Sequence, residues 1–280
     1  MQIKNLSNTN SQSIVDCFNE AFANYFVPIH ASAEYLTLRW KGARIDPALS
    51  FGVFDKDKIV AFMFIGVDEH YGKLTAHNDG TGVIPAYRGN RLVDKMYDLA
   101  IPQFKAKSIE QCSLEVIQEN TRAINVYERI GFKKLREINC YGGEIIRTNA
   151  PTPPNLVIQQ INQPNWKRYQ TCFDFVPCWN NSLNWVKAIQ DTYEVIEIYD
   201  NQQFAGFGAV DKSGSLPIFG IVPAFRQKGY GRILLDYMAA TRPKLRTNNV
   251  DDSATATLQF LEKMGMQNSI NQYEMLFNLT

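Results

Sequence analysis

VIPAYRGNRL (residues 83–92) and IVPAFRQKGYGRILLDYM (residues 221–238) are two versions of one phrase. In each, a proline follows two β-branched residues, and an alanine, an aromatic residue and an arginine come after it. The β-branched residues predict the end of a strand, and the spacing of the apolar residues after the arginine predicts a helix. The phrase therefore predicts a strand–loop–helix unit that occurs twice in the chain.

The segments around the two phrases also follow one order. A polar turn within residues 49–68 and another within residues 193–214 separate apolar runs, which predicts a β-hairpin before each phrase. After each phrase the pattern predicts a helix, a strand and a second helix. These segments are 92–107, 112–117 and 120–132 in the first copy and 231–241, 245–250 and 253–266 in the second. Helices are also predicted before the hairpin of the second half, at residues 165–175 and 181–193, and Asn120 and Gly131 are the predicted N-cap and C-terminal stop of the helix over 120–132. The chain is therefore predicted to contain two halves of one architecture.

Between the halves, residues 147–156 read RTNAPTPPNL and contain three prolines. A proline-rich stretch between two periodic regions is typical of a linker. We therefore predict an N-terminal domain over residues 1–148, a linker over 149–155 and a C-terminal domain over 156–280. Each domain is predicted to be an α/β lobe with a mixed, mostly antiparallel sheet flanked by helices.

Composition excludes several classes of protein. The 280 residues carry a formal net charge of +1, and a nucleic-acid-binding protein would normally show a basic excess, so nucleic acid is not an expected partner. The five cysteines form no CxxC pair and no histidine cluster accompanies them, so we expect buried thiols and no metal site. No leader-like apolar segment and no apolar run of about 18 residues occurs, which predicts a cytoplasmic protein without a membrane partner. The oligomeric state stays open.

The second phrase has the features of an anion-binding loop. A helix N-terminus has unpaired N–H groups and a partial positive charge, and glycines let those groups approach a phosphate. A helix-entry turn without a ligand is the alternative. The predicted diphosphate-binding residues of this half are Ile221, Val222, Arg226, Gln227, Lys228, Gly229, Tyr230, Gly231 and Arg232. Those of the first phrase are Val83, Ile84, Arg88, Gly89, Asn90, Arg91 and Leu92.

The pattern V-x-P-x-(Y/F)-R-x-x-G-x-G at the start of a helix resembles the GNAT superfamily of acetyl-CoA-dependent N-acetyltransferases. A second family pattern, N-x-x-A-x-x-x-Y-x-x-x-G-F, is matched by Asn120, Ala123, Tyr127, Gly131 and Phe132. The resemblance covers nearly the whole chain as two copies, which is similar to the two-lobed acetyltransferases of the mycothiol-synthase type. It implies two tandem acyl-CoA N-acyltransferase lobes and acetyl-CoA as a co-substrate.

The resemblance also implies roles for individual residues. In this family the loop N–H groups hold the coenzyme A pyrophosphate, two splayed strands take the pantetheine, and a tyrosine of the later helix protonates the leaving thiolate. Tyr127 would be this acid, and Asn120 would contact the coenzyme near it. Simple packing of the Tyr127 ring on the sheet is the alternative. Candidates for a base on the acceptor side are His70, His77, Asp79 and Glu115, each of which could equally be a structural residue.

The two copies depart from the family pattern at different positions. The first has Arg91 and Val93 where the loop glycines belong, and the second has Ala254 and Leu261 where the asparagine and tyrosine belong. Because leucine cannot donate a proton, the first half is expected to be catalytic. The predicted function is acetyl-CoA-dependent N-acetyl transfer to a small amine or a peptide amino group by direct attack. The alternative is a non-catalytic protein that binds or senses acyl-CoA.

Overall fold

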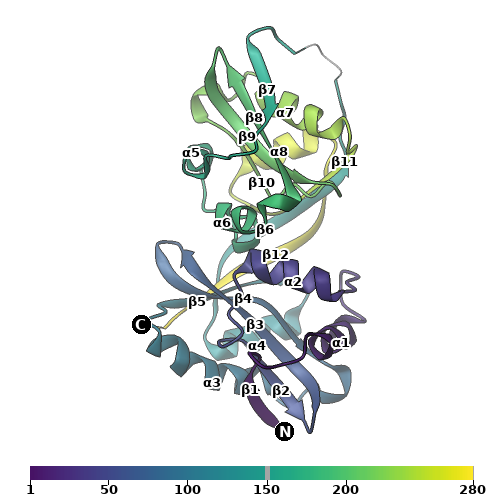
Figure 1. Ribbon diagram of the computed structural model, residues 1–280, viewed down its shortest axis with the longest axis vertical. Coiled ribbons are helices and arrows are strands. Elements are labelled where there is room, and N and C mark those ends of the chain that lie inside the picture. The colour runs from purple at the N-terminus through teal and green to yellow at the C-terminus, as the bar shows by residue number, and fades with distance from the viewer. Residues whose placement is uncertain (149–151, 280) are drawn as a thin grey trace. The chain divides into compact units, whose positions relative to one another are not determined.

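The computed structural model describes residues 1–148 and 152–279. They form two compact units, of which unit 1 comprises Met1–Leu135 and Tyr273–Thr280, and unit 2 comprises Arg136–Gln272 (Figure 1). The units differ from the two sequence halves at both ends: residues 136–148 belong to unit 2, and residues 273–280 belong to unit 1. The first residues of the predicted linker, 149–151, lie outside the described residues.

Unit 1 begins with a short strand and two helices and continues with a three-stranded meander. Its elements are β1 (Gln2–Asn5), α1 (Ser11–Phe22), α2 (Ala33–Ala43), β2 (Phe51–Asp55), β3 (Lys58–His70), β4 (Lys73–Val83), α3 (Leu92–Ala106), β5 (Gln111–Ile117) and α4 (Thr121–Ile130). The strand order is β1-β2-β3-β4-β5-β12, where β12 (Gln267–Asn278) is the last strand of the chain. β1 to β4 are antiparallel, and β4 and β5 are parallel. The last strand of the second half is therefore part of the sheet that the first half begins.

Aromatic side chains of β3 fix the face on which the first two helices pack. Phe62 and Phe64 stack with ring centroids 4.5 Å apart. Phe18 of α1 lies 5.7 Å from Phe62, and Trp40 of α2 lies 4.9 Å from Phe64. Since side chains alternate along a strand, the buried Met63 between them faces the opposite side of the sheet. Both faces of the unit 1 sheet are thus apolar, which explains the continuous buried run in β3.

Unit 2 repeats this order of elements, from β7 to α8. Its elements are most of β6 (Lys133–Glu144), β7 (Leu156–Gln160), α5 (Trp166–Tyr169), α6 (Leu183–Ala188), β8 (Tyr193–Asp200), β9 (Gln203–Asp211), β10 (Ile218–Ile221), α7 (Tyr230–Ala239), β11 (Lys244–Asp251), α8 (Thr255–Lys263) and the start of β12. β10-β9-β8-β7 form an antiparallel sheet, and β11 pairs with β6. The counterparts of α1 and α2 are only short helical segments here, because much of residues 165–193 is loop and 3-10 helix. The longer helices expected at 165–175 and 181–193 are therefore a correction.

Two further expectations are met by local structure. All five cysteines lie in the described residues, all are buried, and none is joined in a disulfide. Asn120 caps α4 by accepting a hydrogen bond from the Ala123 amide at 3.2 Å, and Gly131 ends that helix with φ of +122°. Within residues 1–148 and 152–279, no helix is both long enough and apolar enough to span a membrane.

Candidate active site

The parallel strands β4 and β5 separate along their length. They are paired over four positions, from Thr75↔Gln111 to Asn78↔Leu114. β4 is bulged just after this point, because Phe64 and Ile65 of β3 face Gly80 and Asn78, which leaves Asp79 as the extra residue. β4 then continues along β3 to Val83 without a described partner residue on β5. The bulge thus opens a gap between the carboxyl ends of the two strands.

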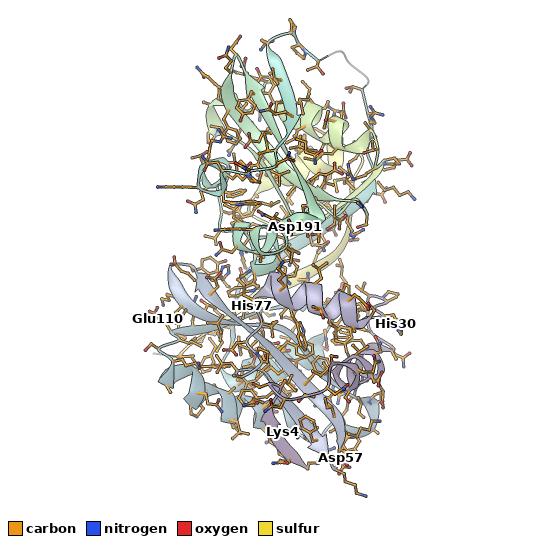
Figure 2. All side chains as sticks on the ribbon, in the orientation of Figure 1. Lys4, His30, Asp57, His77, Glu110 and Asp191 are labelled. Carbon is orange, nitrogen blue, oxygen red and sulfur yellow. The ribbon has the colours of Figure 1, made fainter. Side chains whose placement is uncertain are left out.

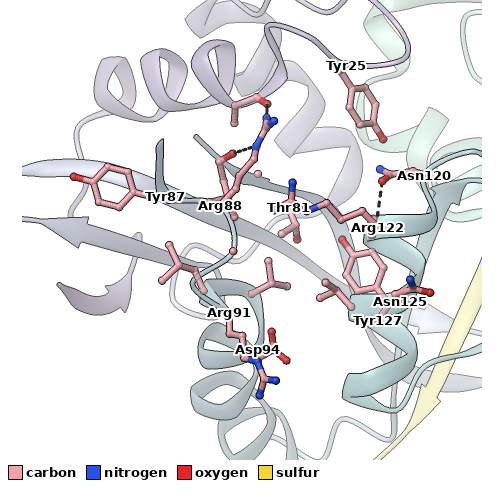
Figure 3. Close-up of a pocket in the computed structure, with 18 of the residues that line it drawn as sticks. Tyr25, Thr81, Tyr87, Arg88, Arg91, Asp94, Asn120, Arg122, Asn125 and Tyr127 are labelled. Atoms are coloured by element: carbon pink, nitrogen blue, oxygen red, sulfur yellow. Dashed lines mark hydrogen bonds between the residues drawn. The ribbon is translucent and has the colours of Figure 1, made fainter. Parts of the chain in front are cut away.

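A cleft of about 650 Å³ lies at this gap (Figure 3). Its walls are the end of α1 with the following segment, the last residues of β4, the loop into α3, and α4. Of the predicted site residues, the cleft is lined by Val83, Arg88, Gly89, Arg91, Leu92, Asn120 and Tyr127. Ile84 is buried and does not line the cleft, and Asn90 donates its side-chain amide to the Tyr87 carbonyl at 3.0 Å. A volume of this size is typical of a small-molecule site.

The backbone of the loop is the same in both halves, although the glycines differ. Gly89 and Arg91 have φ of +84° and +53°, and Gln227 and Gly229, at the matching positions, have +62° and +83°. In each copy, two residues with left-handed backbone, separated by one residue, therefore precede the helix. Arg91 in the first copy was expected as a departure from the glycine pattern, and it holds the glycine conformation despite its side chain.

The arginine of each phrase braces this loop. Arg88 donates from Nε to the Val83 carbonyl at 3.1 Å and from Nη2 to the Ala21 carbonyl at 2.9 Å. Arg226 donates in the same way to the carbonyls of Ile221 and Cys172, at 2.9 and 3.1 Å. Each guanidinium thus ties the loop to the strand before it and to an earlier segment. The sequence suggested coenzyme contact for these arginines, and the structure gives them these backbone partners.

Tyr127 lies on α4 with its hydroxyl at the β4 side of the cleft, where Figure 3 also places Thr81. Desolvation raises the pKa of Tyr127 to about 12, while hydrogen bonds with Thr81 and Asn78 act to lower it. The phenol is therefore protonated at neutral pH. Tyr25, from the segment after α1, points at Asn120, and burial raises its pKa as well.

A hydroxyl and amide network begins at the bulge. Asn78 donates from Nδ2 to the Tyr97 hydroxyl and to Thr81 Oγ1, both at 2.8 Å. Its Oδ1 accepts from the Gly80 amide at 3.1 Å and lies 3.0 Å from Thr81 Oγ1. Asn78 therefore stabilises the bulge through the Gly80 amide. It also joins β4 to α3 through the Tyr97 hydroxyl. Sequence reasoning missed Asn78 and Thr81, because the contact with Tyr97 joins β4 to α3 and no local pattern indicates it.

An ion pair joins α3 and α4 in the cleft wall. Arg129 donates to the Asp94 carboxylate through Nε at 2.7 Å and Nη2 at 2.8 Å. Its hydrogen bond is the largest cause that holds the pKa of Asp94 below the usual range. Both residues line the cleft near the N-terminus of α3. The sequence did not predict this pair, because the two residues are 35 positions apart and no local pattern connects them.

Three of the four predicted base candidates, Asp79, His77 and His70, have side-chain partners within unit 1. Asp79, the bulged residue, receives two hydrogen bonds from Arg39 of α2, at 2.8 and 3.0 Å. His77, labelled in Figure 2, lies 2.9 Å from Ser113 Oγ, and burial is the main cause that keeps its pKa well below the usual value. His70 lies 3.0 Å from Glu274 of β12. Glu115 directly follows Leu114, the last residue of β5 paired with β4.

Unit 2 has a cleft of about 500 Å³ at the corresponding place. Of the predicted residues, it is lined by Ile221, Arg226, Gln227, Gly229, Tyr230, Gly231 and Arg232. Val222 and Lys228 are outside this lining, and Lys228 Nζ lies 5.0 Å above the Phe225 ring. At the position of Tyr127 stands Leu261, which is fully buried. This cleft therefore combines a similar loop with an apolar residue where unit 1 has a phenol.

The strands of unit 2 separate further than those of unit 1, and a side chain fills the gap. The segment that leads into β10 and the strand β11 share one isolated parallel bridge, Ser215↔Arg246. Beyond it, the buried Asn181 donates from Nδ2 to the carbonyls of Pro217 and Asn248, at 2.7 and 2.9 Å. Asn181 thus bridges the two strands at the place where the unit 1 strands diverge freely. Among the residues described, no group of three or more His, Cys, Asp or Glu side chains could hold a metal ion.

Residues 14–132 match the model of the Acetyltransferase (GNAT) family. N-alpha-acetyltransferase 30 of Schizosaccharomyces pombe is 25% identical over 96 residues, which are 34% of this chain and 64% of that protein. The chain thus spans less than two thirds of the length of this curated relative.

Solved structures are similar over the whole chain. A GCN5-related N-acetyltransferase from Sphaerobacter thermophilus has a TM-score of 0.70 at 14% identity, with 99% of this chain and 95% of that chain covered. A tandem GNAT protein from the clavulanic acid biosynthesis pathway has a TM-score of 0.74 at 10% identity, with 100% and 98% covered. The predicted fold class is confirmed: the chain has the mixed α/β GNAT fold, with a large mixed sheet, a second antiparallel sheet and flanking helices.

Proposed function

We propose that the protein is an acetyl-CoA-dependent N-acetyltransferase in which unit 1 carries the reaction. The acceptor would be a small amine or a peptide amino group. The observation that carries the proposal is the Tyr127 phenol in a cleft whose other wall is the left-handed loop before α3. The loop and helix N-terminus would bind the diphosphate, and the unpaired edge of β4 would bind pantetheine as an added strand.

In this proposal the amine nitrogen attacks the thioester carbonyl carbon directly. A C–N bond forms, the C–S bond breaks, and the proton lost by nitrogen is returned to solvent or to a nearby base. The sulfur leaves as a thiolate beside the Tyr127 hydroxyl. Because the pKa of Tyr127 is about 12 and that of a thiol about 8.5, the phenol first stabilises the thiolate by a hydrogen bond. Proton transfer to sulfur then requires additional stabilisation of the phenolate.

For unit 2 we propose coenzyme binding without transfer, the second function considered above. Leu261 cannot donate a proton, and Asn181 occupies the space between β10 and β11. The Gly229 and Gly231 loop keeps the geometry for a diphosphate. In this proposal, unit 1 performs the acetyl transfer and unit 2 binds acyl-CoA, so each of the two predicted functions belongs to one unit.

The test compares acetyl-CoA with dephosphorylated pantetheine in thermal unfolding, and measures coenzyme A release with a panel of amines and peptides. A ligand at 100 times its Kd adds about 2.7 kcal/mol of stability. We expect a clear rise in Tm with acetyl-CoA and a far smaller one with pantetheine. Equal shifts, or no shift from either compound, would overturn the acyl-CoA proposal. Coenzyme binding without release for any amine would leave the binding function and reject the transferase.

A further inference from the structure

We infer that Thr81 is a positioning residue for Tyr127, whose hydroxyl it stabilises as the phenol gives up its proton. The inference rests on the proposed function, because it concerns the acid of that reaction. It goes further by assigning a role to a residue on β4 that carries no recognisable motif. The role follows from how the donors and acceptors around Thr81 are distributed.

Asn78 determines what the Thr81 hydroxyl can do. Both hydrogens of Asn78 Nδ2 are directed to acceptors, one to the Tyr97 hydroxyl and one to Thr81 Oγ1. Thr81 therefore accepts from Asn78 and keeps its own proton for donation. The structure has this proton donated to Asn78 Oδ1 at 3.0 Å. The second acceptor is the oxygen of Tyr127, which lines the same cleft and whose hydroxyl lies on the side of Thr81 (Figure 3). A hydroxyl rotates to suit its best acceptor.

The better acceptor changes during the reaction. With Tyr127 neutral, the Asn78 carbonyl is the better acceptor, and Thr81 donates to it at 3.0 Å. When the Tyr127 O–H bond breaks and its proton moves to the leaving sulfur, the oxygen becomes an anion, and hydrogen bonds to ions are roughly twice as strong as neutral ones. The Thr81 proton then turns to the phenolate. An interaction that strengthens only as charge develops raises kcat and leaves ground-state binding unchanged.

The surroundings of Tyr127 make this contact important. The phenol is desolvated, which raises its pKa, and the Thr81 bond is the first of the causes that lower it. Its titratable neighbours are Tyr25 from the segment after α1 and Tyr97 from α3. Burial raises the pKa of both, so both are neutral phenols and supply no positive charge. Thr81, held by Asn78, is thus the donor best placed to offset the burial of Tyr127.

The experiment is a double-mutant cycle with Thr81→Val and Tyr127→Phe in the full chain. It measures kcat and the KM for acetyl-CoA with the amine of highest turnover in the panel. We expect Thr81→Val to lower kcat about 10- to 100-fold, as for a lost hydrogen bond to a charged group, with KM changed by less than about twofold. Thr81→Ser keeps a hydroxyl and should retain kcat within about fivefold. In the Tyr127→Phe background, Thr81→Val should have no further effect beyond about twofold.

If the losses in kcat from Thr81→Val and Tyr127→Phe multiply in the double variant, the two residues act independently and the inference is overturned. A Thr81→Ser variant with as low a kcat as Thr81→Val would show a merely structural role and overturn it as well. A Tyr127→Phe variant that loses activity while Thr81→Val keeps it would also overturn the inference, yet leave the proposed function intact. Full activity of Tyr127→Phe would instead remove Tyr127 as the acid, and the inference with it. Circular dichroism checks folding. If Thr81→Val does not fold, Thr81→Ala takes its place in the same cycle with the same expected outcomes.

Discussion

Arg91 at the start of α3 adopts the same left-handed backbone as Gly229 at the start of α7, with φ of +53° and +83°. A side chain with a Cβ is strained in this conformation, whereas glycine is not. The loop of unit 1 therefore keeps the shape of an anion-binding loop at some cost in stability. The side chain that causes the strain also adds a positive charge to the wall of the cleft.

Arg91→Gly and Arg91→Ala separate these two contributions. Both variants remove the charge, but only alanine retains a Cβ in the left-handed conformation. We expect Arg91→Gly to exceed Arg91→Ala in free energy of unfolding by about 1 kcal/mol. Both should bind coenzyme A more weakly than the parent, by similar factors. Urea denaturation and titration calorimetry measure the two quantities. An alanine variant as stable as the glycine variant would contradict the strain argument.

Tyr127→Phe tests which unit is catalytic. The change removes one hydroxyl, so folding and coenzyme binding should survive, while kcat should fall about 10²- to 10⁴-fold as for loss of a general acid. Tyr273→Phe is a matched control, because Tyr273 also belongs to unit 1 but does not line the cleft. Steady-state release of coenzyme A is the measurement. Comparable losses in both variants would point to a general effect of removing a tyrosine hydroxyl.

Arg129→Met tests the ion pair between α3 and α4. Without Arg129, the Asp94 carboxylate stands unpaired near the helix N-terminus where the diphosphate is proposed to bind. Repulsion should raise the KM for acetyl-CoA about 5- to 10-fold and change kcat little. Adding Asp94→Asn removes the repelling charge, so the double variant should bind nearly as well as the parent. Failure of this second substitution to restore KM would show that Arg129 contacts the coenzyme itself.

The same pair predicts a pH dependence of stability. The Arg129 hydrogen bond lowers the pKa of Asp94 in the folded protein below its unfolded value of about 3.9. A lowered folded pKa contributes stability that is present above about pH 3.9 and is lost as the pH falls through the folded pKa. The difference in unfolding free energy between parent and Asp94→Asn should therefore shrink in acid. Urea denaturation at pH 6 and at about pH 2.5 measures it. A difference independent of pH would rule out this linkage.

Gly231→Asp tests the loop of unit 2. A Cβ at this position would lie 3.3 Å from the Phe260 ring, so the ring must shift slightly, and the new carboxylate would face the diphosphate. Gly231→Ala is the steric control without the charge. We expect calorimetry to show one coenzyme site fewer for Gly231→Asp, with turnover unchanged because the reaction is assigned to unit 1. Unchanged stoichiometry would mean that this loop is a turn with no ligand.

Local patterns in the sequence were sufficient for the elements and for Tyr127. The repeated phrase predicted the strand, loop and helix at β4 and α3 and again at β10 and α7. Asn120 and Gly131 correctly bounded α4, because caps act on neighbouring residues in the chain. The resemblance to the family pattern then singled out Tyr127, and this residue lines the cleft in the structure. Each of these inferences depends on contacts between residues close in sequence.

The tertiary structure alone decided the features that join distant segments. The last strand, β12, lies in the sheet of unit 1 because strand pairing depends on edges that become available only in the folded sheet. The Asp94–Arg129 pair and the contacts of Asn78 with Thr81 and Tyr97 join separate elements. Arg91 could be read as a lost glycine in the sequence, and only its φ showed that the loop shape persists. The sequence by itself thus determined the local elements and the candidate acid, whereas long-range packing determined the bulge, the gap and the groups that surround the acid.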